Sequence, residues 1–261
     1  MERFLTDARV DPTAWGNAAI RWSSELGHPD VVRLLLADGR ADPTADDNYA
    51  IRLSSREGHT DVVKLLLADR RADPTAIDNY AIQWSSANGH PDVVQLLLTD
   101  GRANPTADDN YAVRSSSQTG HAEVMRLLLA DGCADPADHD NAAIRLSSQY
   151  GHTEVVQLLL ADGRVDPTAF YNLAIQSSSE NGHADVVKLL LADARVDPTA
   201  GNNWAIIWSS MNGHTEVVRL LLADGRADPT TVDDYAIRWS SVNGHADIVQ
   251  LLLANGRANI A

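Results

Sequence analysis

The sequence predicts an all-α repeat solenoid made of stacked helix-turn-helix units. The dipeptide Gly-His recurs eight times at an unbroken interval of 31 residues, and Val-Val-x-Leu-Leu-Leu or a close variant follows each copy. The copies stand at residues 27–28, 58–59, 89–90, 120–121, 151–152, 182–183, 213–214 and 244–245. A fixed period of this length indicates one supersecondary unit that buries its apolar face only against its neighbours.

The period divides residues 1–261 into repeats of one predicted solenoid domain. With Gly-His at positions 13 and 14, the repeats are residues 15–45, 46–76, 77–107, 108–138, 139–169, 170–200, 201–231 and 232–261. Residues 1–14 correspond to the end of a preceding, partial repeat.

The first helix of each repeat is predicted over positions 4–12. Position 3 is Asn or Asp in every repeat, and such a side chain can cap the free N–H groups of a first helical turn. These residues are Asn17, Asn48, Asn79, Asn110, Asn141, Asn172, Asn203 and Asp234. The glycine at position 13 tolerates the left-handed conformation that ends a helix.

The second helix begins at position 15, directly after the histidine. Pro29 and Pro91 suit a first helical position, and the acid at position 16, such as Asp61, faces the positive end of the helix dipole. The segment that follows is apolar nearly all round, as expected of a helix packed on both sides. A loop with Gly39 and Pro43, or their equivalents, closes the repeat.

Residues 58–67, GHTDVVKLLL, resemble an ankyrin repeat, and the resemblance extends over all eight repeats. It implies a solenoid whose first helices and turns line a concave groove that binds another protein. The family unit has about 33 residues, so we expect short turns in place of long β-hairpin fingers. Position 10 is Ser in every repeat where the family commonly has Ala.

The repeats differ mainly at positions 1, 4, 7, 8, 11 and 12, and positions 4, 8, 11 and 12 share one helix face. Three repeats carry an aromatic pair at positions 4 and 8. Because Trp, Tyr and Arg dominate binding hot spots, the predicted partner-binding residues are Tyr49, Arg52, Arg56, Tyr80, Trp84, Tyr111, Arg114, Gln118, Tyr150, Trp204, Trp208, Met211, Tyr235 and Trp239. Alternatively, position 8 is core between adjacent first helices.

Charge and cysteine content restrict the partners and the compartment. The net charge of −15 argues against nucleic acid and against an anionic membrane as partners, because both require a basic face. A single cysteine, Cys133, forms no internal disulfide, and residues 1–6 lack the apolar core of a signal peptide. We therefore expect a cytoplasmic or nuclear protein that is not secreted.

The repeated polar residues do not predict chemistry. Equivalent histidines of stacked repeats should lie roughly 10 Å apart, too far to share a metal ion. A Ser, His and Asp set that recurs in every repeat serves folding and lacks the single dry pocket of a catalytic triad. We expect no enzymatic activity, no metal and no cofactor.

The preferred function is a non-enzymatic scaffold that binds another protein on the concave helix face. The alternative is a designed or recently duplicated scaffold with no specific partner, whose aromatic residues serve packing. A monomer is expected. Neither end has a polar capping repeat, so an apolar strip should be exposed near the C-terminus and end-to-end association is possible.

Overall fold

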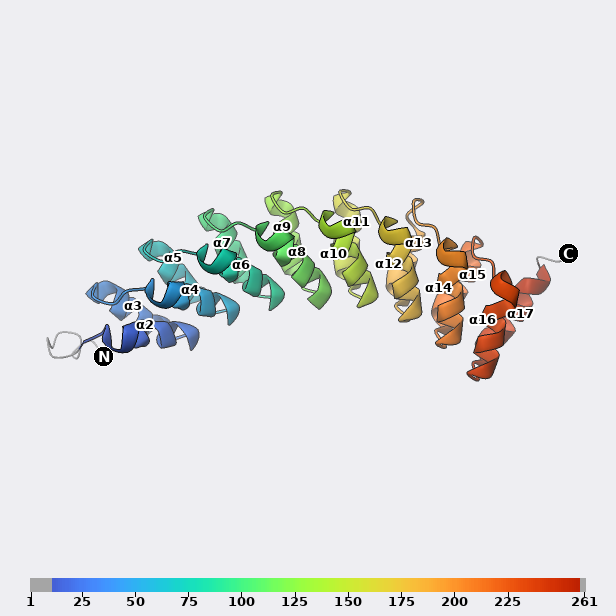
Figure 1. Cartoon of the computed structure of the whole chain (residues 1–261), viewed down its shortest axis with the longest axis horizontal. Coiled ribbons are helices and arrows are strands. Elements are labelled where there is room, and N and C mark those ends of the chain that lie inside the picture. The colour runs from blue at the N-terminus through green and yellow to red at the C-terminus, as the bar shows by residue number, and fades with distance from the viewer. Residues whose placement is uncertain (1–10, 259–261) are drawn as a thin grey trace. The chain divides into compact units, whose positions relative to one another are not determined.

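The computed structural model describes residues 11–258, and all regular elements in that range are helices (Figure 1). The predicted all-α repeat fold is confirmed. The compact turns between repeats stand where β-hairpin fingers would occur, since no strand lies within residues 11–258. Residues 1–10 of the predicted partial repeat lie outside the described residues.

Each repeat contributes two helices. The first helices are α2 (Ala14–Glu25), α4 (Ala45–Arg56), α6 (Ala76–Ala87), α8 (Ala107–Thr119), α10 (Asp138–Gln149), α12 (Ala169–Glu180), α14 (Ala200–Met211) and α16 (Thr231–Val242). The second helices are α3 (Pro29–Asp38), α5 (Thr60–Asp69), α7 (Pro91–Asp100), α9 (Ala122–Asp131), α11 (Thr153–Asp162), α13 (Ala184–Leu191), α15 (Thr215–Asp224) and α17 (Ala246–Ala258).

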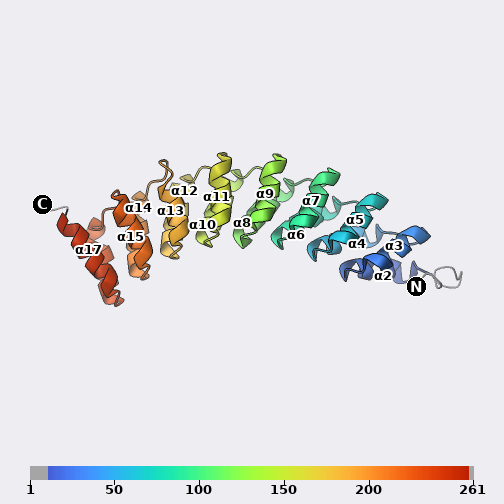
Figure 2. The same cartoon turned by 180° about the vertical axis from the view of Figure 1, so that it is seen from behind.

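The chain forms two compact parts, residues 1–116 with 121–135 and residues 117–120 with 136–261. In the first part, α2, α4 and α6 pack side by side, and α3, α5, α7 and α9 form a second row. In the second part, the rows are α10, α12, α14 and α16, and α11, α13, α15 and α17 (Figures 1 and 2). Within each part, these first helices therefore contact first helices of the next repeat, and second helices contact second helices.

The core lies between the two rows of each part. In the second repeat, Ala50 and Ile51 of the first helix and Val63 and Leu66 of the second are fully buried. Burying one such Leu or Ile side chain contributes roughly 1.5–3 kcal/mol. The same four positions are buried in the third to seventh repeats, whereas Ala19, the equivalent of Ala50 in the first repeat, is exposed. The constant residues of the period therefore form the core of the inner repeats.

The Gly-His dipeptide joins one repeat to the next. The Nε2–H of His90 donates to the carbonyl of Arg56, in the first helix of the preceding repeat, over 2.9 Å. Its ring lies against Gly58, where a Cβ atom would be 2.6 Å from Nδ1. The same hydrogen bond is made by His59, His90, His121, His152, His183, His214 and His245. The glycine is thus required twice, for its positive φ and for the space of the next imidazole.

The asparagine at position 3 does not cap its helix as predicted. Asp46, Asp47 and Asn48 all have left-handed backbone angles, so the right-handed helix begins at Tyr49. The Asn48 Oδ1 accepts the backbone N–H of Asp73, at the end of the same repeat, over 2.7 Å. The correction applies to Asn17, Asn48, Asn79, Asn110, Asn141, Asn172 and Asn203 alike. The amide therefore closes the repeat, because the left-handed turn carries it toward the loop.

Within residues 11–258, six repeats have an arginine in the loop after the second helix that forms an ion pair with the aspartate two residues before it. Four of these arginines also donate to a carbonyl of the preceding repeat. Arg71 binds both carboxylate oxygens of Asp69, at 2.7 and 2.9 Å, and donates to the carbonyl of Ala41. The guanidinium lowers the pKa of Asp69 below its ordinary 3.8. The ion pair between Arg71 and Asp69 therefore stabilises the fold fully above pH 3.8, and this stabilisation is lost as the pH falls through the lowered pKa of Asp69. Cys133 replaces this arginine in the fourth repeat and is exposed.

The last repeat exposes the apolar strip that the sequence predicted near the C-terminus. Val242 is 73% exposed and Leu253 is 44% exposed. Ser241 is also exposed, whereas the serine at position 10 is fully buried in the other repeats. Burial of these positions therefore depends on a following repeat.

The buried serines at position 10 leave their hydroxyl groups without a hydrogen bond. They are Ser24, Ser55, Ser86, Ser117, Ser148, Ser179 and Ser210. Position 9 differs, since Ser85 Oγ donates to the carbonyl of Ile82 over 3.2 Å. A buried donor without a partner costs about 1–3 kcal/mol.

Replacing one of these hydroxyls with hydrogen should stabilise the protein. We expect Ser86→Ala to raise the free energy of unfolding by about 1 kcal/mol, because it removes an unsatisfied buried donor. The matched Ser85→Ala should bring no such gain, since that hydroxyl is bonded. Urea denaturation of the full chain measures both. Equal effects of the two substitutions would contradict the assignment of the unsatisfied group.

The contact between the histidine ring of one repeat and the glycine of the repeat before it, which we call the histidine joint, leads to a second prediction. Gly89 and Gly101 have nearly equal φ values, 72° and 77°, but a Cβ on Gly89 would be 2.5 Å from the His121 ring whereas one on Gly101 meets nothing within 4 Å. Gly101→Ala should cost about 1–2 kcal/mol for its left-handed backbone. Gly89→Ala should cost about 1–3 kcal/mol more, because the ring must move. Thermal denaturation compares them, and equal losses would show that the joint is not a tight contact.

Candidate partner-binding surface

The side chain at position 7 braces the left-handed turn of its own repeat. Arg52 donates from Nε and Nη2 to the carbonyls of Asp47 and Asp46, over 2.7 and 3.0 Å. Gln83 and Arg114 make the corresponding bonds to the carbonyls of Asp78 and Asp108. Two predicted partner-binding residues, Arg52 and Arg114, thus use hydrogen-bonding groups within the chain.

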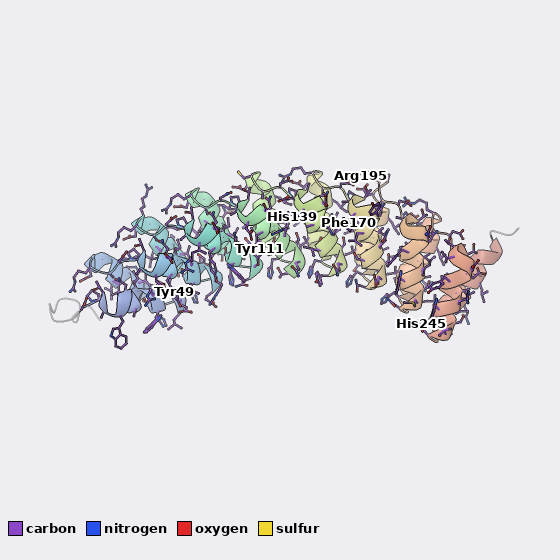
Figure 3. The ribbon with its side chains drawn as sticks, in the orientation of Figure 1. Tyr49, Tyr111, His139, Phe170, Arg195 and His245 are labelled. Carbon is purple, nitrogen blue, oxygen red and sulfur yellow. The ribbon has the colours of Figure 1, made fainter. Side chains whose placement is uncertain are left out.

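A row of aromatic rings and a guanidinium group runs across the first helices of the first part, from Tyr49 to Tyr111, which are labelled in Figure 3. The guanidinium carbon of Arg52 lies 6.0 Å from the ring centre of Tyr49 and 5.4 Å from that of Tyr80. Tyr80 stacks on Trp84 at 5.6 Å, and Trp84 lies 6.2 Å from Tyr111 of the next repeat. We call Tyr49, Arg52, Tyr80, Trp84 and Tyr111 the aromatic row. These predicted residues are brought together in space.

Position 8 is packed to different depths in different repeats. Leu53 is buried, and so are Ser115 and Ser177. Trp84 and Trp208 are half-buried, with part of each indole exposed. Leu146 is half-buried, and Trp22 and Trp239 are exposed. Position 8 is therefore core at Leu53, Ser115 and Ser177, and each tryptophan at this position keeps part of its ring exposed.

The second part holds two further aromatic pairs. Trp204 stacks on Trp208 at 5.3 Å, and Tyr235 lies 5.7 Å from Trp239. With Tyr80 and Trp84, these are the three pairs predicted from positions 4 and 8, and all three are confirmed. Trp204 is 39% exposed, so this pair presents an indole surface to solvent.

The predicted residues at positions 11 and 12 lie beside the histidine joints. The carbonyls of Arg56, Gln118 and Met211 each accept an imidazole N–H. Arg56 forms an ion pair with Glu57, and the ring of Tyr150 stacks on that of His152 at 6.3 Å. The backbone of these positions is thus structural, and only their side chains are left for a partner.

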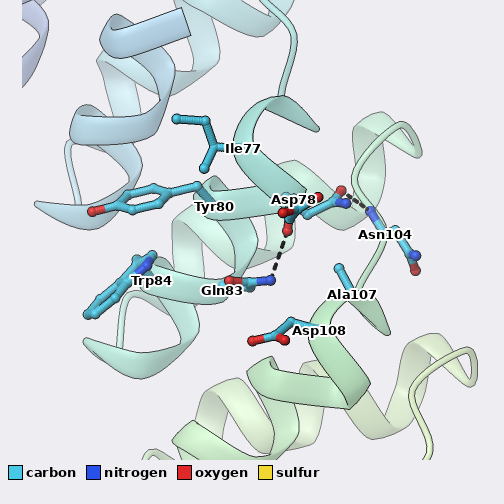
Figure 4. A pocket seen from close by; sticks show the side chains of 9 residues that line it. Ile77, Asp78, Tyr80, Gln83, Trp84, Asn104, Ala107 and Asp108 are labelled. Atoms are coloured by element: carbon cyan, nitrogen blue, oxygen red, sulfur yellow. Dashed lines mark hydrogen bonds between the residues drawn. The ribbon is translucent and has the colours of Figure 1, made fainter. Parts of the chain in front are cut away.

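An open pocket of about 700 Å³ lies beside the aromatic row, between the start of α6 and the start of α8 (Figure 4). Tyr80, Gln83 and Trp84 line it from α6, and Asp108 lines it from α8. Figure 4 shows the Gln83 amide, bonded to the Asp78 carbonyl, on the same side of the pocket as the Asp108 carboxylate, with the Trp84 ring to its left. The pocket therefore combines aromatic faces with negative charge.

Comparison with known families matches this architecture over most of the chain. Residues 79–171 and 172–261 match a model described as ankyrin repeats in three copies. The chain belongs to the ankyrin-repeat family. Residues 49–98 and 15–48 match further models of ankyrin repeats. No curated protein is a significant match to the chain.

Two features of this ankyrin-repeat protein's site are not evident from its sequence. The sequence groups position 7 with the variable positions, yet it is Arg or Gln in seven repeats and Ile207 in one. In the sequence, these hydrogen bonds to the turn are indicated by a long side chain with an N–H donor that stands five or six residues after the turn. Asp78 and Asp108, which line the pocket, were not selected because acidic loop residues recur throughout the chain.

The rim of the pocket contains a strained residue. Ile77 has φ 49°, a left-handed conformation that is unusual for a β-branched side chain, whereas Gly201 occupies the same position in another repeat. Ile77→Gly should raise the free energy of unfolding by about 0.5–1 kcal/mol by relieving this strain.

The control is Ala76→Gly, at the adjacent residue, which has right-handed helical angles. It should lower stability by about 1 kcal/mol, because glycine has more freedom to lose there. Urea midpoints of both variants test the assignment. A loss of stability in Ile77→Gly as large as that in Ala76→Gly would contradict a left-handed turn at this position.

Proposed function

We propose that this ankyrin-repeat protein is a non-enzymatic scaffold that binds another protein through the exposed faces of its first helices. Ankyrin repeats are in general protein–protein interaction modules. The observation that carries the proposal is the aromatic row beside the open pocket in the first part. Half-buried Trp and Tyr side chains are already held rigid by packing, so little entropy is lost when a partner covers them.

Each part carries its own set of the predicted partner-binding residues. The first part contributes Tyr49, Arg52, Arg56, Tyr80, Trp84, Tyr111 and Arg114, and the second contributes Gln118, Tyr150, Trp204, Trp208, Met211, Tyr235 and Trp239. Tyr80 and Trp84 are the proposed centre, because they line the pocket and belong to the row.

A second candidate is a scaffold without a specific partner, in which the aromatic residues serve packing. It is favoured by the contact of Trp84 with Tyr111 across a repeat boundary, which stabilises the stack whether or not a partner binds. The two candidates differ in whether loss of these rings changes binding or only stability.

The setting proposed for the protein is the cytoplasm or the nucleus, and the proposed partner is neither nucleic acid nor membrane. Cys133 is exposed and without a disulfide partner, and the net charge is −15. Between residues 11 and 258, no helix combines the length and apolar character needed to cross a bilayer.

The test is affinity capture with the full chain, followed by affinity measurement on the captured protein after its purification. The double variant Tyr80→Ala/Trp84→Ala should weaken binding at least 30-fold, the effect of losing a hot spot of about 2 kcal/mol. Trp22→Ala is the matched control, since Trp22 is exposed and lies outside the aromatic row. It should bind as the parent does.

Circular dichroism melts must show that the double variant is folded at the assay temperature. A partner that binds the parent and the folded double variant equally would contradict the proposed surface. A double variant that only lowers the melting temperature, with no change in the proteins captured, would favour the second candidate.

A further inference from the structure

The junction between the first and second repeats shows how a guanidinium group fits between neighbouring first helices. Arg21, at position 7, pairs with Asp46, at position 1 of the next repeat, over 2.5 Å. Its guanidinium carbon lies 5.5 Å from the ring centre of Tyr49, and Nη2 donates to the carbonyl of Trp15. A carboxylate, an aromatic face and a carbonyl thus surround one cation.

The junction between the third and fourth repeats keeps this environment but lacks the cation. Asp108 stands at the position of Asp46 and Tyr111 at that of Tyr49, whereas Gln83 replaces the arginine. The shorter amide reaches only the carbonyl of Asp78, over 2.8 Å. The pocket of about 700 Å³ lies at this junction. Within residues 11–258, the Asp108 carboxylate makes no hydrogen bond and no ion pair.

The other junctions do not combine these features. Arg52 at position 7 precedes Ile77 at position 1, so a cation is present without a carboxylate. Where position 7 is Gln176, the next position 1 is Gly201, which supplies no charge. An aromatic face with an uncompensated carboxylate therefore occurs together with an open pocket at the junction of Gln83.

We propose that this pocket receives the guanidinium group of an arginine side chain from the bound partner. The inference rests on the proposed function and names the chemistry of its central contact. A planar guanidinium can stack on an aromatic ring while it donates two parallel hydrogen bonds to a carboxylate, which an ammonium group cannot do. Trp84 and Tyr80 line the pocket with aromatic rings, and Asp108 and Asp78 line it with carboxylates. Tyr111 lies behind this lining, with its ring centre 6.2 Å from that of Trp84. The net charge of −15 favours a partner segment that is basic.

The first test uses the ¹⁵N-labelled full chain and three small probes. These are Nα-acetyl-arginine amide, its neutral isostere Nα-acetyl-citrulline amide, and Nα-acetyl-lysine amide. The indole N–H signal of Trp84, assigned by its loss in Trp84→Phe, should shift saturably with the arginine probe at a Kd of about 1 mM, typical of so small a ligand. The lysine probe should bind at least tenfold more weakly, and the citrulline probe should cause no saturable shift.

Two variants separate the pocket from general charge effects. Asp108→Asn should weaken binding of the arginine probe at least tenfold, whereas Asp47→Asn, an exposed acidic residue outside the pocket lining, should leave it unchanged. Gln83→Arg should abolish binding, because the new side chain fills the pocket as Arg21 does between the first two repeats. It should also raise the melting temperature.

Equal binding of the arginine and citrulline probes, equal binding of the arginine and lysine probes, or no effect of Asp108→Asn and Gln83→Arg would each overturn the inference. A partner that depends on Tyr80 and Trp84 but binds Asp108→Asn and Gln83→Arg like the parent would overturn it and leave the proposed function standing. Selective binding of the arginine probe with no protein partner captured would support the pocket and count against the proposed function.

Discussion

The imidazole of one repeat lies against the glycine of the repeat before it, and the rest of the stack depends on this contact. The hydrogen bond from Nε2–H to a carbonyl near the end of the preceding first helix satisfies a group that the helix itself leaves open. The missing Cβ of the glycine allows the ring to approach. Because the contact sets the spacing of neighbouring first helices, it also sets the distances between side chains at positions 4, 7 and 8, from which the candidate surface is built.

A left-handed turn before each first helix accounts for much of what is unusual in the repeat. Three successive residues with positive φ are costly unless they are glycine, and Ile77 and Val232 occur among them. The turn is held from two sides, by the asparagine amide that binds the loop N–H and by the position 7 side chain that binds the turn carbonyls. It leaves position 1 at the junction with the preceding repeat, where Asp46 meets Arg21.

The candidate site is formed by a few side chains that differ between repeats of otherwise constant structure. Positions 1, 4, 7 and 8 vary, while the histidine joint, the buried Ile and Leu side chains and the turn are kept. Gln83 stands where five other repeats have an arginine, and the pocket lined by Trp84 and Asp108 lies beside it. Where Arg52 remains, the guanidinium lies between two tyrosine rings within the chain. Positions 1 and 7 thus decide whether the carboxylate at a junction is paired with a cation of the chain itself.

The sequence by itself determined the repeat length, the helix positions and the aromatic pairs, because these depend on a 31-residue period and on spacings within one helix. It also predicted that the glycine of each Gly-His dipeptide ends the first helix, because a residue in the left-handed conformation commonly terminates a helix and glycine adopts it without strain. Only the tertiary structure decided that the histidines bond the preceding repeat, that Asn48 bonds a loop 25 residues away, that Ser86 is buried without a partner, and that a pocket opens beside Gln83. Those contacts join atoms of different helices and loops, and their geometry follows from a left-handed turn that no local residue pattern specifies.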